Sequence, residues 1–497
     1  MLFESNALFL FDKTYKYVPI TNYQFRFILA IFFFSSLFVP KVFSQNFNYN
    51  IQLNEVSFHA PEAGEENWIL IFEDPLPNLQ GSPVIQPANV ISGIDQTVTY
   101  EGGDQPIIRP AAYVSGSIGR VSAIFKTADC SGSFYIKGVC SSNGIVLYQL
   151  PNLLLTINQQ GIIDYPPSSF NAPFPNNTVQ HYENFTITWY MSDNANSTGR
   201  IIGQSNNPVY VTRNIPSLFG EIYHSLLYIG CKNAHGVSSP SQVVKKIYDD
   251  FLDRCVQRFN SLHCMEYWGN NIPQQYFGDG SCFTAGALLA YEDATCGAWA
   301  DLFNALIQVQ GISGSELSIV TWNYGIFPPS SLVEFAPTVQ SFFQNDANLV
   351  SYFMYSDTYF FVKNWKIQTT NGYNNLYFPD FQCLECEEVL PSTSLTLSNG
   401  NELFRVDDIG LPGQGNPDPR SAFNNHAVVK YGGKYFDPSY GSPIKGTAQQ
   451  WTSDAIEGLG GVIIYQRIEN GMNMYYNVMW AGHTLDGANV QEVILSP

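Results

Sequence analysis

The spacing of apolar residues changes once along this chain of 497 residues, near Ser241, and that change constrains the fold most strongly. From about residue 46 to 243, short alternating runs are broken by clusters of Gly, Pro, Asn and Ser, which is typical of strands joined by turns. Beyond this point, apolar residues recur at helical spacing from Val244 to Cys255. Because the chain is also longer than one core usually organises, we predict an α+β protein with several domains.

The first half predicts one or two β-sandwich domains. Strand-like runs occur at 68–72, 121–125, 185–190, 209–212 and 226–231. The Pro-rich stretch from Pro166 to Pro175 indicates a border between a β-rich domain at 45–165 and an immunoglobulin-like module at 166–241. The pair Trp189 and Cys231 resembles an immunoglobulin core.

The N-terminal 44 residues predict a signal peptide region. Arg26 precedes an apolar run over 27–39, and Val42 and Ser44 suit the −3 and −1 positions of a cleavage before Gln45. The alternative is an N-terminal anchor helix, although the run is short for a membrane span. The residues before Arg26 are many for a signal peptide, so translation can start further in. We expect a secreted protein with no stable membrane insertion after cleavage.

Charge and cysteine content agree with export. The formal charge is −19, from 23 basic and 42 acidic side chains, which disfavours nucleic-acid partners. The nine cysteines suit an oxidising compartment, and their odd number leaves a free thiol. We expect Cys130 and Cys140 to bridge two strands. Cys383 and Cys386 form a lone CxxC motif, for which a local disulfide is preferred because zinc needs about four ligands. We predict no cofactor and no metal.

A helix is predicted over 293–306, with Cys296 in its first turn. Asp293 or Thr295 can cap its start, and Gly311 can end it in the left-handed conformation. A thiol at a helix start experiences the positive end of the helix dipole, which favours the reactive thiolate. The alternatives are a buried structural cysteine and half of a disulfide. The residues that share one face of this helix with Cys296 are Trp299, Leu302, Phe303, Leu306 and Gln310.

A hairpin is predicted over 426–438, turning at Gly432 and Gly433. A two-residue turn places Asp437 diagonally across from His426, at roughly 7 to 8 Å between backbones, on the same face. The carboxylate can then orient the imidazole, which takes the proton of a thiol. The alternative is a strand histidine with a purely structural role.

The order of a helix-starting Cys296, a strand His426 and a strand-ending Asp437-Pro438 resembles the transglutaminase-like superfamily over roughly residues 245–497. The resemblance implies a papain-like arrangement, in which the cysteine helix packs on an antiparallel sheet that carries His and Asp. It predicts a catalytic domain at 242–497 with Cys296, His426 and Asp437 as the catalytic residues. His426 follows Cys296 by 130 positions, which exceeds the spacing in compact members, so we expect an insertion at about 313–420.

The resemblance also bears on the oxyanion hole and on the reaction. Trp268 is a candidate donor, with a core tryptophan as the alternative, and the backbone N–H of Cys296 is a second donor. The family's usual Gly before the cysteine is replaced by Ala294-Thr295. Members act on amide bonds through a thioester, which water or an amine resolves.

Two functions follow from these features. The first is a secreted cysteine enzyme, a protease, amidase or transglutaminase-type acyltransferase, whose partner is a protein or peptide substrate. Its β-rich half would contact a polymer or a cell surface. The alternative is a surface-binding or scaffold protein that carries a degenerate transglutaminase-like domain.

Overall fold

The computed structural model describes most of the chain beyond residue 49. The described residues are 50–61, 69–77, 90–92, 100–101, 107–128, 130–218, 220–269, 284–321, 349–362, 386–388, 411–417, 419, 422–423, 425–447, 450–451, 455–469, 472–483 and 491–495. All elements below belong to one compact unit, Ile51–Pro497. The predicted signal peptide and its cleavage site lie outside the described residues.

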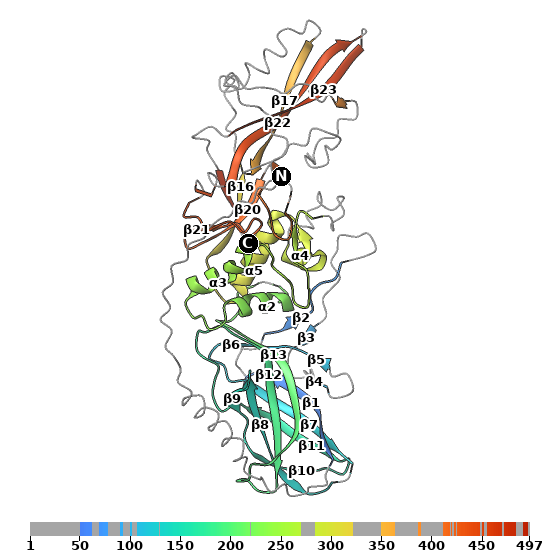
Figure 1. The fold of residues 1–497 in the computed structure, drawn as a ribbon, viewed down its shortest axis with the longest axis vertical. Helices are drawn as coiled ribbons and strands as arrows, with labels where there is room; N and C mark the ends of the chain where they lie inside the picture. Colours follow the sequence, from blue (N-terminus) through green and yellow to red (C-terminus); the bar gives the residue numbers. More distant parts are fainter. Residues whose placement is uncertain are drawn as a thin grey trace, which may run out of the picture. The chain divides into compact units, whose positions relative to one another are not determined.

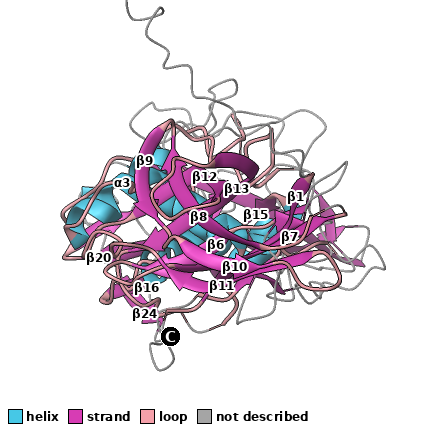
Figure 2. Cartoon of the chain, turned by 90° about the horizontal axis from the view of Figure 1, so that it is seen from below, coloured by secondary structure: helices cyan, strands magenta, loops and turns pink. Residues whose placement is uncertain are grey.

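The N-terminal strands form two main sheets, which we call the two-sheet region (Ile51–Thr212). Five strands pair in the order β11-β7-β1-β4-β5, and five more in the order β10-β8-β12-β13-β6, with β9 added to β8. The bounds are β1 Ile51–His59, β4 Tyr100–Glu101, β5 Ile107–Ile108, β6 Ala111–Val114, β7 Arg120–Thr127, β8 Ser133–Ser142, β9 Ile145–Gln149, β10 Leu153–Thr156, β11 Ile162–Ser169, β12 Gln180–Ser192 and β13 Arg200–Thr212. A separate pair joins β2 (Ile71–Phe72) to β3 (Val90–Ser92). Figure 2 draws the strands in magenta and labels many of those in the two main sheets.

Alternation along the strands builds the shared core of the two main sheets. On β7, Val121, Ala123 and Phe125 are buried while their neighbours are partly exposed, as a strand with one covered face requires. The ring of Phe125 meets that of Trp189 from β12 edge to face, with centroids 5.4 Å apart. Side chains from both sheets therefore fill one apolar core.

Strands from both sides of the predicted border at residue 166 pair with one another. Pro166 and Pro167 lie within β11, an edge strand that pairs with β7, and the register shifts between Tyr165 and Ser168. Proline lacks a backbone N–H, so it is tolerated at a sheet edge and at such an irregularity. β12 pairs with β8. The segments 45–165 and 166–241 thus share their sheets.

The strand expected at 226–231 is wrong, because this run lies in helix α2 (His224–Asn233). A continuous apolar run of six residues does not show whether its period is that of a strand or that of a helix. This helix is apolar on most sides because strands and α5 both cover it. Asp74 accepts a hydrogen bond from Ser225 N, 2.9 Å, at the helix start. Cys231 therefore packs in a different core from Trp189, and the immunoglobulin-like pairing is also wrong.

Four helices lie within the described residues: α2, α3 (Pro240–Leu252), α4 (Ala285–Tyr291) and α5 (Cys296–Val309). α3 confirms the predicted change to helical spacing, with Pro240 in its first turn and Val244, Tyr248 and Phe251 buried. None of the helices in the described ranges combines the length and apolar character needed to cross a membrane. Together with the sheets below, the fold is α+β, as predicted.

The helices pack against small sheets, and we call this part the helix-and-sheet region (His224–Leu495). A four-stranded sheet has the order β21-β20-β16-β24, and α5 lies against β20 and β16 (Figure 1). A second sheet has the order β18-β23-β22-β17-β19, and β14 pairs in parallel with β15. The bounds are β14 Glu266–Tyr267, β15 Asp293–Ala294, β16 Ser315–Thr321, β17 Leu349–Val362, β18 Cys386–Glu388, β19 Ala422–Phe423, β20 Asn425–Tyr431, β21 Lys434–Phe436, β22 Ile456–Glu469, β23 Met472–His483 and β24 Gln491–Leu495.

The start of the predicted insertion at 313–420 needs correction, because β16 belongs to the four-stranded sheet. It pairs with β20 on one side and with β24 on the other, so residues 315–321 are part of the central framework. The segment that interrupts this framework begins after Thr321. The two adjacent apolar residues Ile319 and Val320 do not indicate from the sequence which sheet this strand joins.

The described cysteines are mostly unpaired. One disulfide joins Cys255 to Cys264, between α3 and β14. The bridge predicted between Cys130 and Cys140 is wrong, since both are free and Cys140 points into the core of the two-sheet region. Cys282 and Cys383 lie outside the described residues, and so does the predicted local disulfide of the CxxC motif.

Candidate active site

Helix α5 places Cys296 at its first position. The backbone before it is extended, with Asp293 and Ala294 in β15, so the helix begins abruptly at the thiol. The predicted inner face is confirmed: Trp299, Leu302, Phe303, Leu306 and Gln310 are fully buried. Gly311, with φ +64°, ends the helix as predicted. Cys296 is 5% exposed and is not in a disulfide, so its sulfur stays available for chemistry.

The predicted hairpin is present in the predicted register. Tyr431 faces Lys434, and the two turn residues Gly432 and Gly433 have φ of +57° and +74°. Such a turn requires positive φ at both positions, which glycine adopts without strain. Asp437 directly follows β21 and is thereby placed near His426 on β20.

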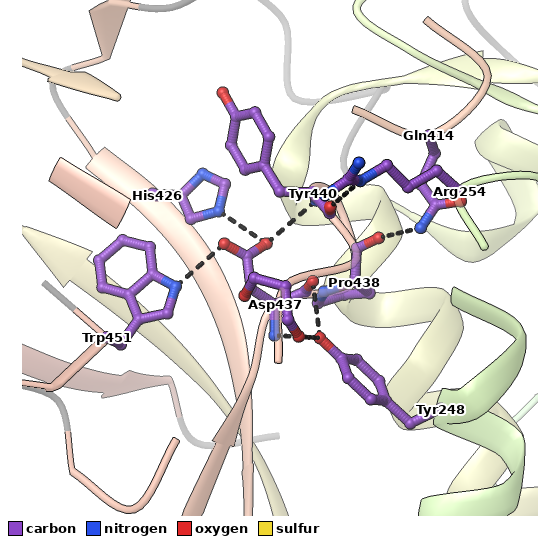
Figure 3. Close-up of polar contacts among 9 residues, drawn as sticks. Tyr248, Arg254, Gln414, His426, Asp437, Pro438, Tyr440 and Trp451 are labelled. Atoms are coloured by element: carbon purple, nitrogen blue, oxygen red, sulfur yellow. Dashed lines mark hydrogen bonds and ion pairs between the residues drawn. The ribbon is translucent and has the colours of Figure 1, made fainter. Parts of the chain in front are cut away.

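The two side chains meet in the interior. His426 Nε2 donates to Asp437 Oδ1 at 3.1 Å, and both residues are 1% exposed. The carboxylate has two more donors: the indole Nε1 of Trp451 at 3.0 Å from Oδ2, and the backbone N of Tyr440 at 3.4 Å from Oδ1 (Figure 3). Asp437 is therefore an oriented hydrogen-bond acceptor that faces the imidazole.

Distant residues fix the backbone around Asp437. The hydroxyl of Tyr248 on α3 accepts from Asp437 N at 3.1 Å, and it lies 2.9 Å from Asp437 O and 2.6 Å from Ser442 O. The Gln414 amide donates to Pro438 O at 2.8 Å and to Phe251 O at 2.7 Å. Sequence reasoning missed both residues. They are ordinary polar side chains, and only the folded chain brings them to the turn after β21.

The pKa of His426 depends on both other predicted catalytic residues, Asp437 and Cys296. Burial acts to lower the pKa of His426, but the charge and hydrogen bond of Asp437 outweigh it, helped by hydrogen bonding and charge interaction with Cys296. The net result raises this pKa to about 10. The imidazole is thus positively charged at neutral pH, between a carboxylate and a sulfur that both favour that charge.

The predicted oxyanion residue Trp268 lies beside the strand that leads to Cys296. It follows β14, has φ +51°, and its backbone N donates to Ala294 O at 3.1 Å. The Asn416 amide donates to the carbonyl of Trp268 at 2.8 Å. The residue packs partly buried against the core, so its indole serves at least as core packing. This placement keeps it as a candidate.

Tyr267, which sequence reasoning missed, contacts the imidazole. Its buried ring lies edge-on to His426, with centroids 6.5 Å apart, and to Tyr440 at 5.1 Å. Burial, with smaller contributions from Tyr440, Cys296 and Asp437, raises the pKa of Tyr267 well above its ordinary value. Its phenol therefore remains protonated, and it can donate a hydrogen bond near the thiol.

No metal site accompanies these residues in the part of the chain that the structure describes: no group of three or more His, Cys, Asp or Glu side chains is placed to hold a metal ion. The arrangement can nevertheless perform nucleophilic chemistry, because it combines a thiol, an imidazole and an orienting carboxylate. Comparison of the sequence with family models and with curated proteins found no match.

Proposed function

We propose that this protein is a cysteine enzyme that acts on amide bonds of proteins or peptides through a thioester. The observation that carries this proposal is the buried contact between His426 Nε2 and Asp437 Oδ1 at 3.1 Å, with the Cys296 thiol interacting with the same imidazole. A purely structural histidine needs no charged carboxylate inside the protein, where an ion pair is costly to bury. Nucleophilic catalysis gives this arrangement a role.

In the proposed mechanism, the Cys296 proton is held on Nδ1 of His426, the ring nitrogen opposite the Asp437 contact. The thiolate attacks the amide carbonyl carbon, and a C–S bond forms while the carbonyl oxygen becomes negative. The imidazolium then gives its proton to the amide nitrogen, the C–N bond breaks and an amine leaves. His426 next takes a proton from water or from an acceptor amine, which attacks the thioester. The thiol is released together with an acid or a new amide.

The negative oxygen needs hydrogen-bond donors. The backbone N–H of Cys296 lies at the start of α5, where N–H groups have no partner within the helix. Trp268 is the second proposed donor, and the neutral phenol of Tyr267 is an alternative. Removing one such donor typically lowers kcat by about 10² to 10³. Whichever substitution lowers kcat by this amount, Trp268→Phe or Tyr267→Phe, therefore identifies the second donor.

The fold and the setting belong to the same proposal. α5 packs on a small antiparallel sheet that carries His426, which supports a transglutaminase-like, papain-like domain in the helix-and-sheet region, with α2 included in its core. The two main sheets of the two-sheet region share one apolar core, which supports a β-sandwich. This β-sandwich would position the enzyme on a polymer or a cell surface. Secretion rests on the predicted signal peptide. We favour hydrolysis over acyl transfer, since water is the abundant nucleophile outside the cell.

Incubation of the purified protein with casein, with and without a primary amine, tests this function. Shortened fragments indicate proteolysis, released ammonia alone indicates hydrolysis of glutamine side chains, and incorporated amine indicates acyl transfer. Cys296→Ala should abolish all three, whereas Cys231→Ala, which removes a buried thiol of α2, should retain them. Unchanged turnover by Cys296→Ala contradicts the proposal.

The alternative is a scaffold whose helix-and-sheet region has lost activity. It is favoured by the large two-sheet region, which contains none of the three residues. Alkylation of Cys296 by iodoacetamide near neutral pH distinguishes the two functions. We expect wild type to react faster than an ordinary thiol and His426→Ala to lose that advantage, whereas equal rates support the scaffold.

A further inference from the structure

The imidazole of His426 is surrounded by aromatic rings. Trp451 stacks on it, with centroids 5.4 Å apart and planes 7° from parallel. Tyr440 lies at 5.5 Å with a tilt of 38°, and Tyr267 meets it edge-on at 6.5 Å. All three rings are 2% exposed or less. A face-on ring stabilises a neighbouring cation through its quadrupole, most strongly where water is excluded.

Trp451 contacts the catalytic pair in two ways. Its ring lies parallel to that of His426, with centroids 5.4 Å apart, and its Nε1 donates to Asp437 Oδ2 at 3.0 Å, a contact that Figure 3 shows. Two hydrogen bonds hold the backbone at the side chain: Thr447 Oγ1 accepts from Gln450 N at 3.1 Å, and Thr447 O accepts from Trp451 N at 3.1 Å.

We propose that Trp451 is a positioning residue with two separable roles. Its ring face stabilises the protonated imidazole of His426, and its indole N–H holds the Asp437 carboxylate in the orientation that aligns that imidazole. The second role bears on catalysis and rests on the proposed function. The first concerns the charge of a buried ring and holds whether or not the protein turns over a substrate.

The indole N–H matters because a carboxylate can rotate. Asp437 Oδ1 accepts from His426 and from Tyr440 N, whereas the described contact of Oδ2 is with Trp451. Bonds to both oxygens fix the plane of the carboxylate, and through it the tilt of the imidazole. Hydrogen bonds to a charged group are stronger than neutral ones, so this contact is a firm constraint.

The contribution of the ring face is judged against the other groups that face the imidazole. Asp437, after β21, and Cys296, from α5, supply the favourable charge, and burial opposes it. Tyr267 from β14 and Tyr440 from the turn after Asp437 supply aromatic rings. Of these rings, Trp451 alone is both parallel to the imidazole and within 5.5 Å of it. It therefore contributes most of the aromatic stabilisation among the described neighbours.

Two substitutions separate the roles. Trp451→Phe retains an aromatic face but removes the donor, and Trp451→Leu removes both. Trp189→Phe and Trp189→Leu are the matched controls: Trp189 is a fully buried tryptophan of the two-sheet region, with Phe125 and Tyr165 as aromatic neighbours. Circular dichroism and thermal unfolding show which variants fold. If Trp451→Leu does not fold, Trp451→Met replaces it.

Two measurements on the full-length protein need no substrate. NMR of labelled histidine from pH 6 to 11, with His426→Ala for assignment, reports the charge of His426. The rate of Cys296 alkylation by iodoacetamide at pH 7 reports the alignment of the thiol and imidazole. We expect Trp451→Leu to lower the titration midpoint by about one pH unit. Trp451→Phe should shift it by less than about half a unit, yet slow alkylation about tenfold.

The outcomes separate this inference from the proposed function. Equal midpoints in wild type and in the Leu or Met variant overturn the ring role, and equal alkylation rates in wild type and Trp451→Phe overturn the donor role. The same changes in the Trp189 variants would mean that loss of any buried indole suffices, which also overturns the inference. The expected shift in midpoint without any turnover of casein would leave the ring role standing and remove the proposed function.

Discussion

The two-sheet region and the helix-and-sheet region use the same residue types in opposite ways. In the first, Trp189 packs against Phe125 and Tyr165, and its indole N–H makes no hydrogen bond within the described residues. In the second, the indoles of Trp451 and Trp299 donate to Asp437 and to Glu266 O. The first region thus buries the indole of Trp189 for apolar packing alone, whereas the second also uses the N–H groups of its indoles to fix a geometry.

Buried thiols differ in the same way. Cys140 lies in the apolar core of the two-sheet region, where burial raises the pKa of its thiol and leaves it unreactive. Cys296 is also buried, but it begins a helix and interacts with a protonated imidazole. Burial alone therefore does not decide the chemistry of a side chain. Its polar neighbours do.

The largest expected effect comes from Asp437→Asn. An amide cannot supply the negative charge that holds the imidazolium, so kcat/KM on an amide substrate should fall about 10³- to 10⁴-fold. The pKa of His426 should also fall, which moves the alkaline loss of activity to lower pH. Asp164→Asn, an exposed acid on β11, is the control and should leave activity unchanged. Full activity of Asp437→Asn would remove the contrast between the regions.

Histidines in the two parts should give opposite dependences of stability on pH. The raised pKa of His426 means that its stabilisation is complete below pH 6.5 and is lost as pH rises through about 10. His181, on β12, has its pKa lowered to about 4, chiefly by burial and also by nearby His235 and Lys232. Its neutral form is favoured by folding, so stability should fall as pH drops from about 6.5 towards 4.

Urea unfolding at a series of pH values measures both dependences. His426→Gln should flatten the alkaline side of the free-energy profile, and His181→Phe, which retains a ring against Tyr210, should flatten part of the acid side. Identical profiles for wild type and both variants would show that neither histidine is ionised as described.

Tyr248→Phe should weaken both stability and activity. Its hydroxyl bonds the backbone of Asp437, and its loss leaves buried polar groups unsatisfied, at a cost of about 1 to 3 kcal/mol. Tyr113→Phe is the counterpart in the two-sheet region, where the hydroxyl donates to His59 O at 3.0 Å. We expect a similar loss in unfolding free energy from Tyr113→Phe, but unchanged kcat/KM. Equal losses of activity would contradict the special role of the Asp437 turn.

The smallest effect is expected at two glycine turns. Gly433 in the β20–β21 turn has φ +74°, and Gly144 in the β8–β9 turn has φ +77°, and a Cβ at either would meet open space. Gly433→Ala and Gly144→Ala should each cost about 1 kcal/mol in unfolding free energy, from backbone strain alone. Clearly unequal costs, measured by urea unfolding, would show that the regions differ even in local turn energetics.

Local signals in the sequence predicted the parts of the site that depend on local structure. Apolar spacing and glycine chemistry predicted a helix over 293–306, which begins at Cys296 in the structure, and the hairpin that turns at Gly432. Trp451, Tyr248 and Gln414 could not be identified, because no local pattern links them to partners that lie 14, 189 and 24 residues away. The helix α2 was mistaken for a strand, since its apolar run reflects burial on several sides and not a period.

The bond between Tyr248 and Asp437 spans 189 residues, and β16 pairs with β24 from near residue 495. Loop-closure entropy must be overcome before such contacts contribute, so they form late and slowly. As the chain leaves the ribosome, Cys296 emerges long before its imidazole and carboxylate partners. The nascent polypeptide thus carries only an ordinary thiol until His426 and Asp437 have also been synthesised and the helix-and-sheet region has folded.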